Sequence, residues 1–123
     1  MDNFEFIFDS STNILYKNYF GKINMDDIYN SWHYAFENNL IPQNTKGFIL
    51  DYRKASFDID SKKYKKIVSF YKKNISFFKD KKIAVITNSS KDIVIPILVE
   101  QKDKGYSSKP FSTVEAAIRW IHI

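Results

Sequence analysis

The chain contains no cysteine, and it has only three glycines and two histidines among its 123 residues. The absence of cysteine excludes a disulfide framework, a thiol nucleophile and a cysteine-ligated metal site, so nothing requires an oxidising compartment. So few glycines leave no glycine-rich loop for a phosphate group and no Gly-x-Ser-x-Gly elbow for a nucleophilic serine. We therefore expect a cytoplasmic protein without a cofactor.

Long hydrophobic runs are also missing, since no stretch approaches the roughly 20 apolar residues that cross a bilayer. The N-terminal apolar run is short, and it carries acidic residues where a signal peptide would carry positive charge. We expect no integral membrane segment and no secretory signal.

Arginine is scarce although the chain is basic, with 19 Lys and Arg against 14 Asp and Glu. Only Arg53 and Arg119 are arginines, whereas sites that read nucleic acid favour the planar fork of the guanidinium group. The net charge of +5 permits contact with nucleic acid or anionic lipid without establishing it. We expect no nucleic-acid partner.

Aromatic residues, in contrast, are abundant: 11 Phe, 8 Tyr and 2 Trp stand in a chain that is 44% hydrophobic. This composition is typical of an ordered globule, and the length is that of one ordinary domain. We expect a single domain over residues 1–123, and core packing explains most of the aromatic side chains.

The most informative stretch is 46–66, KGFILDYRKASFDIDSKKYKK. Its run Phe48-Ile49-Leu50 is apolar without alternation, which is typical of a strand covered on both faces. Asp60 is placed to cap a helix that begins at Ser61. The stretch therefore predicts a buried strand, a polar loop from Tyr52 to Ser61 and a helix.

The other elements follow from apolar periodicity. Alternation predicts an opening hairpin of strands 4–8 and 14–20, with Ile14, Tyr16 and Phe20 inward. Helical spacing predicts helices from about Asn24 to Leu40, Ser61 to Phe77, Ile95 to Lys104 and Ser112 to Ile121, and short strands at 83–87 and 106–111. The predicted fold class is α/β: a single mixed sheet of about five strands opened by the hairpin, with about four helices.

This layout resembles the STAS family, the sulfate transporter and anti-sigma factor antagonist domains, together with its STAS-like and CRAL-TRIO-like relatives. The matching pieces are the hairpin, FILDYRKASFDIDSKK, KKIAVITNSS and the closing FSTVEAAIRWI. They cover nearly the whole chain. The resemblance implies a mixed sheet with helices mostly on one side, and a regulatory function exerted through protein contacts.

Anti-sigma factor antagonists of this family carry Asp-Ser-Ser-Gly at the helix start, and a partner kinase phosphorylates the first serine. Asp60 and Ser61 match the first two positions, whereas Lys62 and Lys63 replace the other two. The resemblance thus implies phosphorylation of Ser61, at a helix N-terminus that would stabilise a phosphate. The alternative is that Ser61 is simply a favourable residue for the first turn.

We predict a small non-enzymatic module that binds a protein partner. Its interaction surface would consist of Tyr52, Arg53, Asp58, Asp60 and Ser61. The alternative is a binder of a small apolar or anionic ligand at the carboxyl edge of the sheet, where open sheets bind ligands. We expect a monomer or a homodimer.

Catalytic and metal-binding residues are not evident. A general acid–base pair drawn from Asp51, Asp58 and Asp60 is conceivable, but no residue pattern indicates a substrate. His33 and His122 lack partners at ligand spacing, and the paired aspartates are typical of helix caps. We expect no catalytic residue and no metal ligand.

Overall fold

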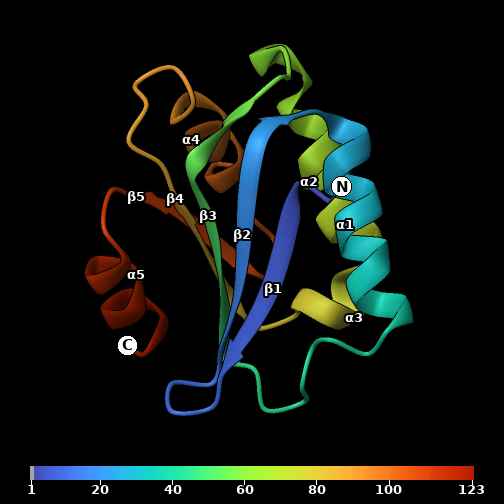
Figure 1. The fold of residues 1–123 in the computed structure, drawn as a ribbon, viewed down its shortest axis with the longest axis vertical. Coiled ribbons are helices and arrows are strands. Elements are labelled where there is room, and N and C mark those ends of the chain that lie inside the picture. Colours follow the sequence, from blue (N-terminus) through green and yellow to red (C-terminus); the bar gives the residue numbers. More distant parts are fainter. Residues whose placement is uncertain (1) are drawn as a thin grey trace.

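The computed structural model describes residues 2–123, which form one five-stranded sheet with helices on both faces (Figure 1). The strand order is β1-β2-β3-β4-β5, with β1 antiparallel to β2 and the other neighbours parallel. In chain order the elements are β1 (Phe4–Asp9), β2 (Ile14–Ile23), α1 (Met25–Glu37), β3 (Gly47–Phe57), η1 (Ser61–Lys63), α2 (Tyr64–Lys73), α3 (Ile75–Phe78), β4 (Lys82–Ile86), α4 (Val94–Glu100), β5 (Ser107–Phe111) and α5 (Val114–Ile121). The predicted fold class is confirmed.

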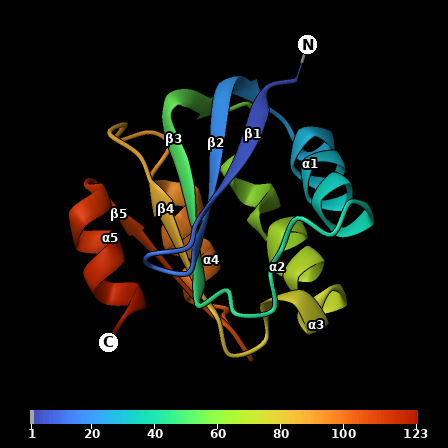
Figure 2. The ribbon, with the colours of Figure 1, turned by 60° about the horizontal axis from the view of Figure 1, so that its bottom comes forward.

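The helices divide unequally between the two faces of the sheet. Figure 2 shows α1, α2 and α3 on one side and α5 on the other. Side chains of α1, α2 and α4 share one large buried cluster with the sheet, and α5 builds a smaller cluster on the opposite face. The expectation of helices mostly on one side is confirmed.

The opening hairpin is present, and both faces of its second strand are covered. Leu15, Lys17 and Tyr19 are at most 1% exposed and lie on the side of the large cluster. The predicted inward residues, Ile14, Tyr16 and Phe20, lie on the opposite face. Ile14 is 0% exposed in the smaller cluster and Tyr16 packs against it, so the prediction is confirmed for these two, whereas Phe20 is only half-buried. The prediction did not include the second buried face, because the set that faces the larger core contains a lysine.

The strands β2 and β3 extend beyond β4 (Figure 1). After a register shift between Asn18 and Phe20, the pairing resumes at Phe20 with Lys54 and continues to Ile23 with Phe57. The predicted loop from Tyr52 to Ser61 is therefore wrong for its first half: β3 continues to Phe57, because β2 supplies hydrogen-bond partners that the apolar run alone does not reveal.

The helix boundaries are set by local hydrogen bonds. Asn24 caps α1 in a capping box with Asp27, and Asp60 caps η1 as predicted. The expected continuous helix from Ser61 is instead split into η1, α2 and α3. Its break falls at Asn74, whose backbone and side-chain nitrogens both bond to the carbonyl of Phe70.

The two C-terminal helices also differ from the prediction at their ends. α4 runs from Val94 to Glu100 rather than from Ile95 to Lys104, and it tolerates Pro96 because the proline lies in its first turn. The cap of α5 is Thr113, which accepts from the nitrogen of Ala116, and not Ser112.

Lys17 is a lysine inside the large cluster. Its side chain is 0% exposed, and Nζ lies 4.0 Å from the ring centroid of Trp32, 4.6 Å from that of Tyr19 and 5.4 Å from that of Phe6. Within residues 2–123, Nζ has no hydrogen-bond partner. Burial holds the pKa of the Lys17 ammonium well below its ordinary value of 10.5. The rings therefore supply its polar environment through cation–π contacts.

The helix α5 is fastened at the amino end of the parallel strands. The ammonium of Lys82 donates to the carbonyls of Trp120 at 2.8 Å and Ile123 at 3.3 Å. At Gly47 a Cβ atom would lie 2.7 Å from the Lys82 carbonyl oxygen and 2.8 Å from Ile121. Glycine is thus required where α5 approaches the start of β3.

Candidate functional site

The carboxyl ends of β3 and β4 enclose a groove of about 370 Å³, here called the carboxyl-edge groove. Its lining residues are Phe57, Ile59, Asp60, Ser61, Lys91, Asp92, Val94 and Ile95. One wall is the segment between β3 and η1, and the other is the segment between β4 and α4. Neighbouring parallel strands end at the same edge of the sheet, which explains why two segments far apart in sequence meet here.

The first wall is held by backbone hydrogen bonds. The nitrogen of Asp58 donates to the carbonyl of Ile23 at 2.8 Å, and a carboxylate oxygen of Asp60 accepts from the nitrogen of Lys62 at 2.9 Å. Ser61 is half-buried in the first turn of η1, whereas Asp58 and Asp60 are exposed. Asp60 therefore shapes the loop, and all three residues lie at the groove or beside it.

The second wall is tied to the first by Asp92. Its carboxylate is only 3% exposed and accepts from the nitrogen of Phe57 at 3.2 Å. The nitrogen of Asp92 donates in turn to the hydroxyl of Ser89 at 3.2 Å. Lys91 and Asp92 are missing from the predicted site. The signal that could have found them is their place in the segment that links β4, a buried strand parallel to β3, to α4.

Two exposed apolar side chains extend the carboxyl-edge groove along α4. Val94 is 41% exposed and Ile97 is 40% exposed, one helical turn apart. Ile59 is half-buried on the facing wall, and the charged side chains of Asp60 and Lys91 stand at the rim. An apolar centre with a charged rim is typical of a protein-binding surface.

Tyr52 does not belong to this surface, although it was predicted there. It is 3% exposed, and its ring stacks between Tyr19 and Phe57, with centroids 4.5 Å and 4.2 Å away. Because β3 continues through Tyr52, strand alternation turns this side chain into the large cluster. The prediction that Tyr52 contributes to an interaction surface is wrong. Tyr106, only 5% exposed, is buried as well.

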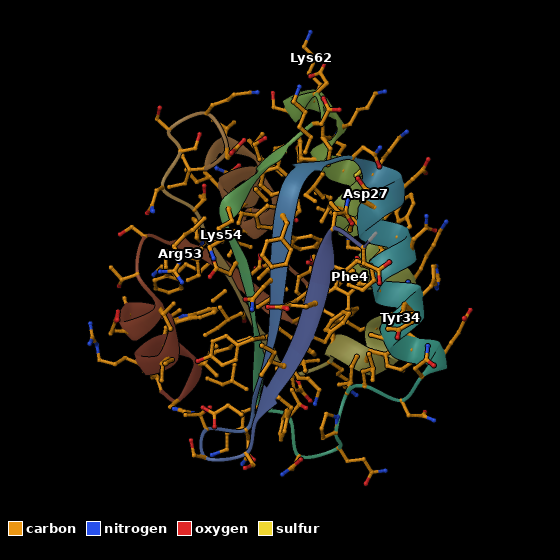
Figure 3. All side chains as sticks on the ribbon, viewed as in Figure 1. Phe4, Asp27, Tyr34, Arg53, Lys54 and Lys62 are labelled. Carbon is orange, nitrogen blue, oxygen red and sulfur yellow. The ribbon has the colours of Figure 1, made fainter. Side chains whose placement is uncertain are left out.

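Arg53 points to the opposite face of the sheet and lies apart from the carboxyl-edge groove. Figure 3 shows it with Lys54 on the side of β3 away from α1, well below Lys62. Its guanidinium donates three hydrogen bonds of 2.7–3.1 Å to the carboxylate of Asp51. The structure therefore separates the predicted surface into Asp58, Asp60 and Ser61 at one place and Arg53 at another.

Arg53 lines a second groove of about 550 Å³, here called the sheet-face groove, over the part of β1, β2 and β3 that α5 leaves uncovered. Its lining residues are Glu5, Asn18, Tyr19, Phe20, Asp51, Arg53 and Lys54. The register shift in the pairing of β2 and β3 falls here and places two successive cations at the same groove. Burial alone would raise the pKa of the Asp51 carboxyl, but the hydrogen bonds from Arg53 outweigh it and hold that pKa below 3.8.

Of the three aspartates considered from the sequence for an acid–base pair, the structure separates Asp51 from Asp58 and Asp60. Asp51 is bound to Arg53 in the sheet-face groove, whereas Asp60 is bound to the backbone of Lys62 in the carboxyl-edge groove. Within residues 2–123, no group of three or more His, Asp or Glu is arranged to hold a metal ion. No helix of the same residues is long and apolar enough to span a membrane.

No family model matches the chain, and no curated protein matches it in sequence. Two solved structures are similar over nearly its full length. The first is an uncharacterized protein of the DUF3478 family with a SpoIIAA-like fold from Shewanella loihica PV-4, at 16% identity and a TM-score of 0.65, with 98% of this chain and 95% of that chain covered.

The second is the anti-sigma factor antagonist SpoIIAA in its unphosphorylated form. It is 14% identical, with a TM-score of 0.51, and the match covers 97% of each chain. At such identities the likeness concerns the arrangement of helices and strands alone. The chain therefore has a SpoIIAA-like, and hence STAS-like, fold.

Proposed function

We propose that the chain is a small, non-enzymatic regulatory module that binds a protein partner at the carboxyl-edge groove. The observation that carries this proposal is the pair of exposed apolar side chains on α4, Val94 and Ile97, beside a groove with charged residues at its rim. Exposed apolar side chains gathered at one site are a feature of binding surfaces. The fold supports the proposal, since one similar structure is an anti-sigma factor antagonist.

The chemistry of the groove favours binding over catalysis. Asp60 is engaged as a helix cap, and Asp92 is buried against the backbone of Phe57. A catalytic carboxylate needs a free oxygen within reach of a substrate and an arrangement of acid and base around it. Val94 and Ile97, the exposed apolar residues beside the groove, contribute to binding by packing.

Site-specific photo-crosslinking tests the proposal. A benzophenone amino acid at position 94 should crosslink a specific partner in a lysate of the source organism, to be identified by mass spectrometry. With the partner purified, Val94→Ser together with Ile97→Ser should weaken binding about tenfold or more, because apolar anchors at an interface cost more than about 1 kcal/mol each when truncated.

Ile7 provides the matched control. It is 52% exposed on the edge strand β1, away from the carboxyl-edge groove, so Ile7→Ser removes exposed apolar surface of a similar size. Equal binding by wild-type protein and the Val94/Ile97 variant, or an equal loss in the Ile7 variant, would count against the proposed surface.

We further propose that Ser61 is the phosphorylated residue, by the resemblance to the family motif. Ser61 lines the carboxyl-edge groove, so a phosphate there would add about two negative charges to the partner-binding site. Ser61→Asp should change partner affinity, whereas Ser61→Ala should not. Unchanged affinity in both variants would remove the switch and leave the binding module.

A second candidate function is the binding of a small anionic ligand in the sheet-face groove. Arg53 and Lys54 offer two cations there, and Asp51 holds the guanidinium in place. Citrate titrated into labelled protein should shift the amide resonances of β3 in NMR spectra, and Lys54→Gln should abolish the shift. An apolar ligand has less support, because the cavity of about 30 Å³ in the large cluster holds little more than a water molecule.

A further inference from the structure

The positive charge of the chain is concentrated in one segment. Residues 61–79 contain seven lysines and no acidic residue, so the remaining residues carry twelve basic and fourteen acidic side chains and a net charge of −2. All seven lysines are exposed. Within residues 2–123 the one ion pair joins Arg53 and Asp51, so these seven charges face solvent unneutralised. The segment is thus a cationic surface on an otherwise slightly acidic molecule.

A groove of about 640 Å³ between α1 and α2, here called the helix groove, lies within this cationic surface. Its lining residues are Tyr29, His33, Lys65, Lys66, Ser69, Phe70, Lys73 and Asn74. Three of them are lysines and none is acidic. The helices α1 and α2 run side by side in both views (Figures 1 and 2), and the carboxyl-edge groove is formed by other segments.

The floor of the helix groove is aromatic. Phe70 is 5% exposed, with the ring of Tyr29 at 5.5 Å and that of His33 at 5.7 Å between centroids. A floor of low polarity beneath exposed ammonium groups strengthens their attraction for an anion, because the field passes through less water. The hydroxyl of Ser69 adds a hydrogen-bond donor among the lysines.

We propose that the helix groove binds an acidic, extended segment of a protein partner. Lys65 and Lys73 are eight residues apart, which corresponds to about 12 Å along a helix. An extended chain covers that distance in about four residues, so carboxylates three or four positions apart in the segment reach both ends of the groove. The proposal rests on the proposed function only in taking the partner to be a protein, since it concerns a different surface.

Two other polyanions fit the groove less well. Single-stranded nucleic acid binds by stacking successive bases on accessible aromatic rings, whereas of the three rings that line the groove Phe70 is covered, Tyr29 is half-buried and His33 alone is exposed. The segment 61–79 also contains no arginine for bidentate contacts to bases or phosphates. A bilayer surface favours apolar side chains that insert beside the basic ones, and the exposed large hydrophobic residues lie outside α2.

Fluorescence anisotropy with a labelled deca-glutamate peptide tests the proposal. Wild-type protein should bind it, with affinity that falls as salt rises. Lys65→Glu, Lys66→Glu and Lys73→Glu together should reduce the affinity about tenfold or more, and the corresponding Gln variant should reduce it by a smaller factor. Circular dichroism of both variants verifies that α2 remains folded.

The matched control is Lys22→Glu, Lys102→Glu and Lys104→Glu, three exposed lysines outside the groove. This control has the same net charge as the Lys65/Lys66/Lys73→Glu variant, and it should bind the peptide within about twofold of the wild-type affinity. An equal loss in the two triple variants would overturn the proposal, since binding would then follow net charge alone. Tighter binding of single-stranded RNA or of phosphatidylserine vesicles than of the peptide, through the same lysines, would also overturn it.

The uncharged variant Val94→Ser with Ile97→Ser separates this inference from the proposed function. It should bind the deca-glutamate peptide as the wild-type protein does. If crosslinking at position 94 recovers a partner while the peptide fails to bind, the carboxyl-edge groove stands and the helix groove does not.

Discussion

One face of the sheet is covered by α1, α2, α3 and α4, whereas the other carries α5 alone. Among the described residues, the first face contributes to a cluster of twenty buried hydrophobic side chains and the second to a cluster of six. The first face also buries a lysine, and the second leaves polar residues open in the sheet-face groove. The large core therefore supplies enough apolar burial to tolerate a lysine nitrogen without a hydrogen-bond partner, while the smaller one leaves room for a solvent-accessible site.

The largest expected effect is a loss of stability, and it compares the tryptophan of the larger cluster with the tryptophan packed against the smaller one. Trp32 is 0% exposed, and its ring centroid lies 5.1 Å from that of Phe78. Trp32→Ala should therefore lower the free energy of unfolding by about 3–5 kcal/mol. Trp120, half-buried against Phe111, should lower it by about 1–2 kcal/mol when replaced by alanine. Urea denaturation measures both, and equal losses would contradict the ranking of the two faces.

The next effect concerns Lys17, whose replacement should raise the free energy of unfolding rather than lower it. Lys17→Met keeps the shape of the side chain and removes an amine without a hydrogen-bond partner, so it should raise the free energy of unfolding by about 1–3 kcal/mol at pH 7. The cation–π contacts to Trp32 and Tyr19 offset part of this gain. A destabilised Met variant would show that those contacts outweigh the cost of burial.

The pH dependence gives a second readout for Lys17. Its pKa is lowered in the folded state, so between that lowered value and 10.5 the unfolded chain binds more protons at this site. Stability from this group must therefore rise with pH across that window. The difference in unfolding free energy between wild type and Lys17→Met should shrink as pH increases toward 10.5. A constant difference would contradict the lowered pKa.

The smallest expected effect lies in the sheet-face groove. The pKa of Asp51 is lowered in the folded state, so this carboxylate contributes to the free energy of unfolding above pH 3.8. The contribution disappears as the pH falls through the folded-state pKa. The Arg53 side chain is 45% exposed, and solvent screening therefore limits the loss in Asp51→Asn to less than about 1 kcal/mol at neutral pH. Chemical denaturation at pH 7 and near pH 2 measures the difference, which should be smaller at the lower pH.

The fold was predictable where apolar residues run without interruption or recur at helical spacing. The strands at Phe48–Leu50 and Ile83–Ile86 follow from such patterns, and the cap Asp60 follows from its place before the helix start. The burial of the face with Leu15, Lys17 and Tyr19 did not follow, because a lysine within an alternating pattern predicts a face exposed to solvent. Tertiary contacts, and not local preference, decide its side.

The candidate site was predictable only in part for a similar reason. The segment from Asp58 to Ser61 was found from the strand-to-helix junction, but Tyr52 and Arg53 were assigned to it as loop residues. Pairing with β2 makes them strand residues on opposite faces. Lys91 and Asp92 were missed, because no local motif marks the facing wall of a groove that two distant segments form together.

The placement of α5 has a consequence for how the molecule opens. Its hydrophobic contacts belong to the smaller cluster, and the sheet separates them from the larger one. Release of α5 would therefore uncover Ile49 and Ile86 on the outer face of the sheet without disturbing Trp32. We expect the amide hydrogens of α5 to exchange with solvent deuterium well before those in the buried turns of α1 and α2. The chain would then behave as two cooperative units of unequal stability that share one sheet.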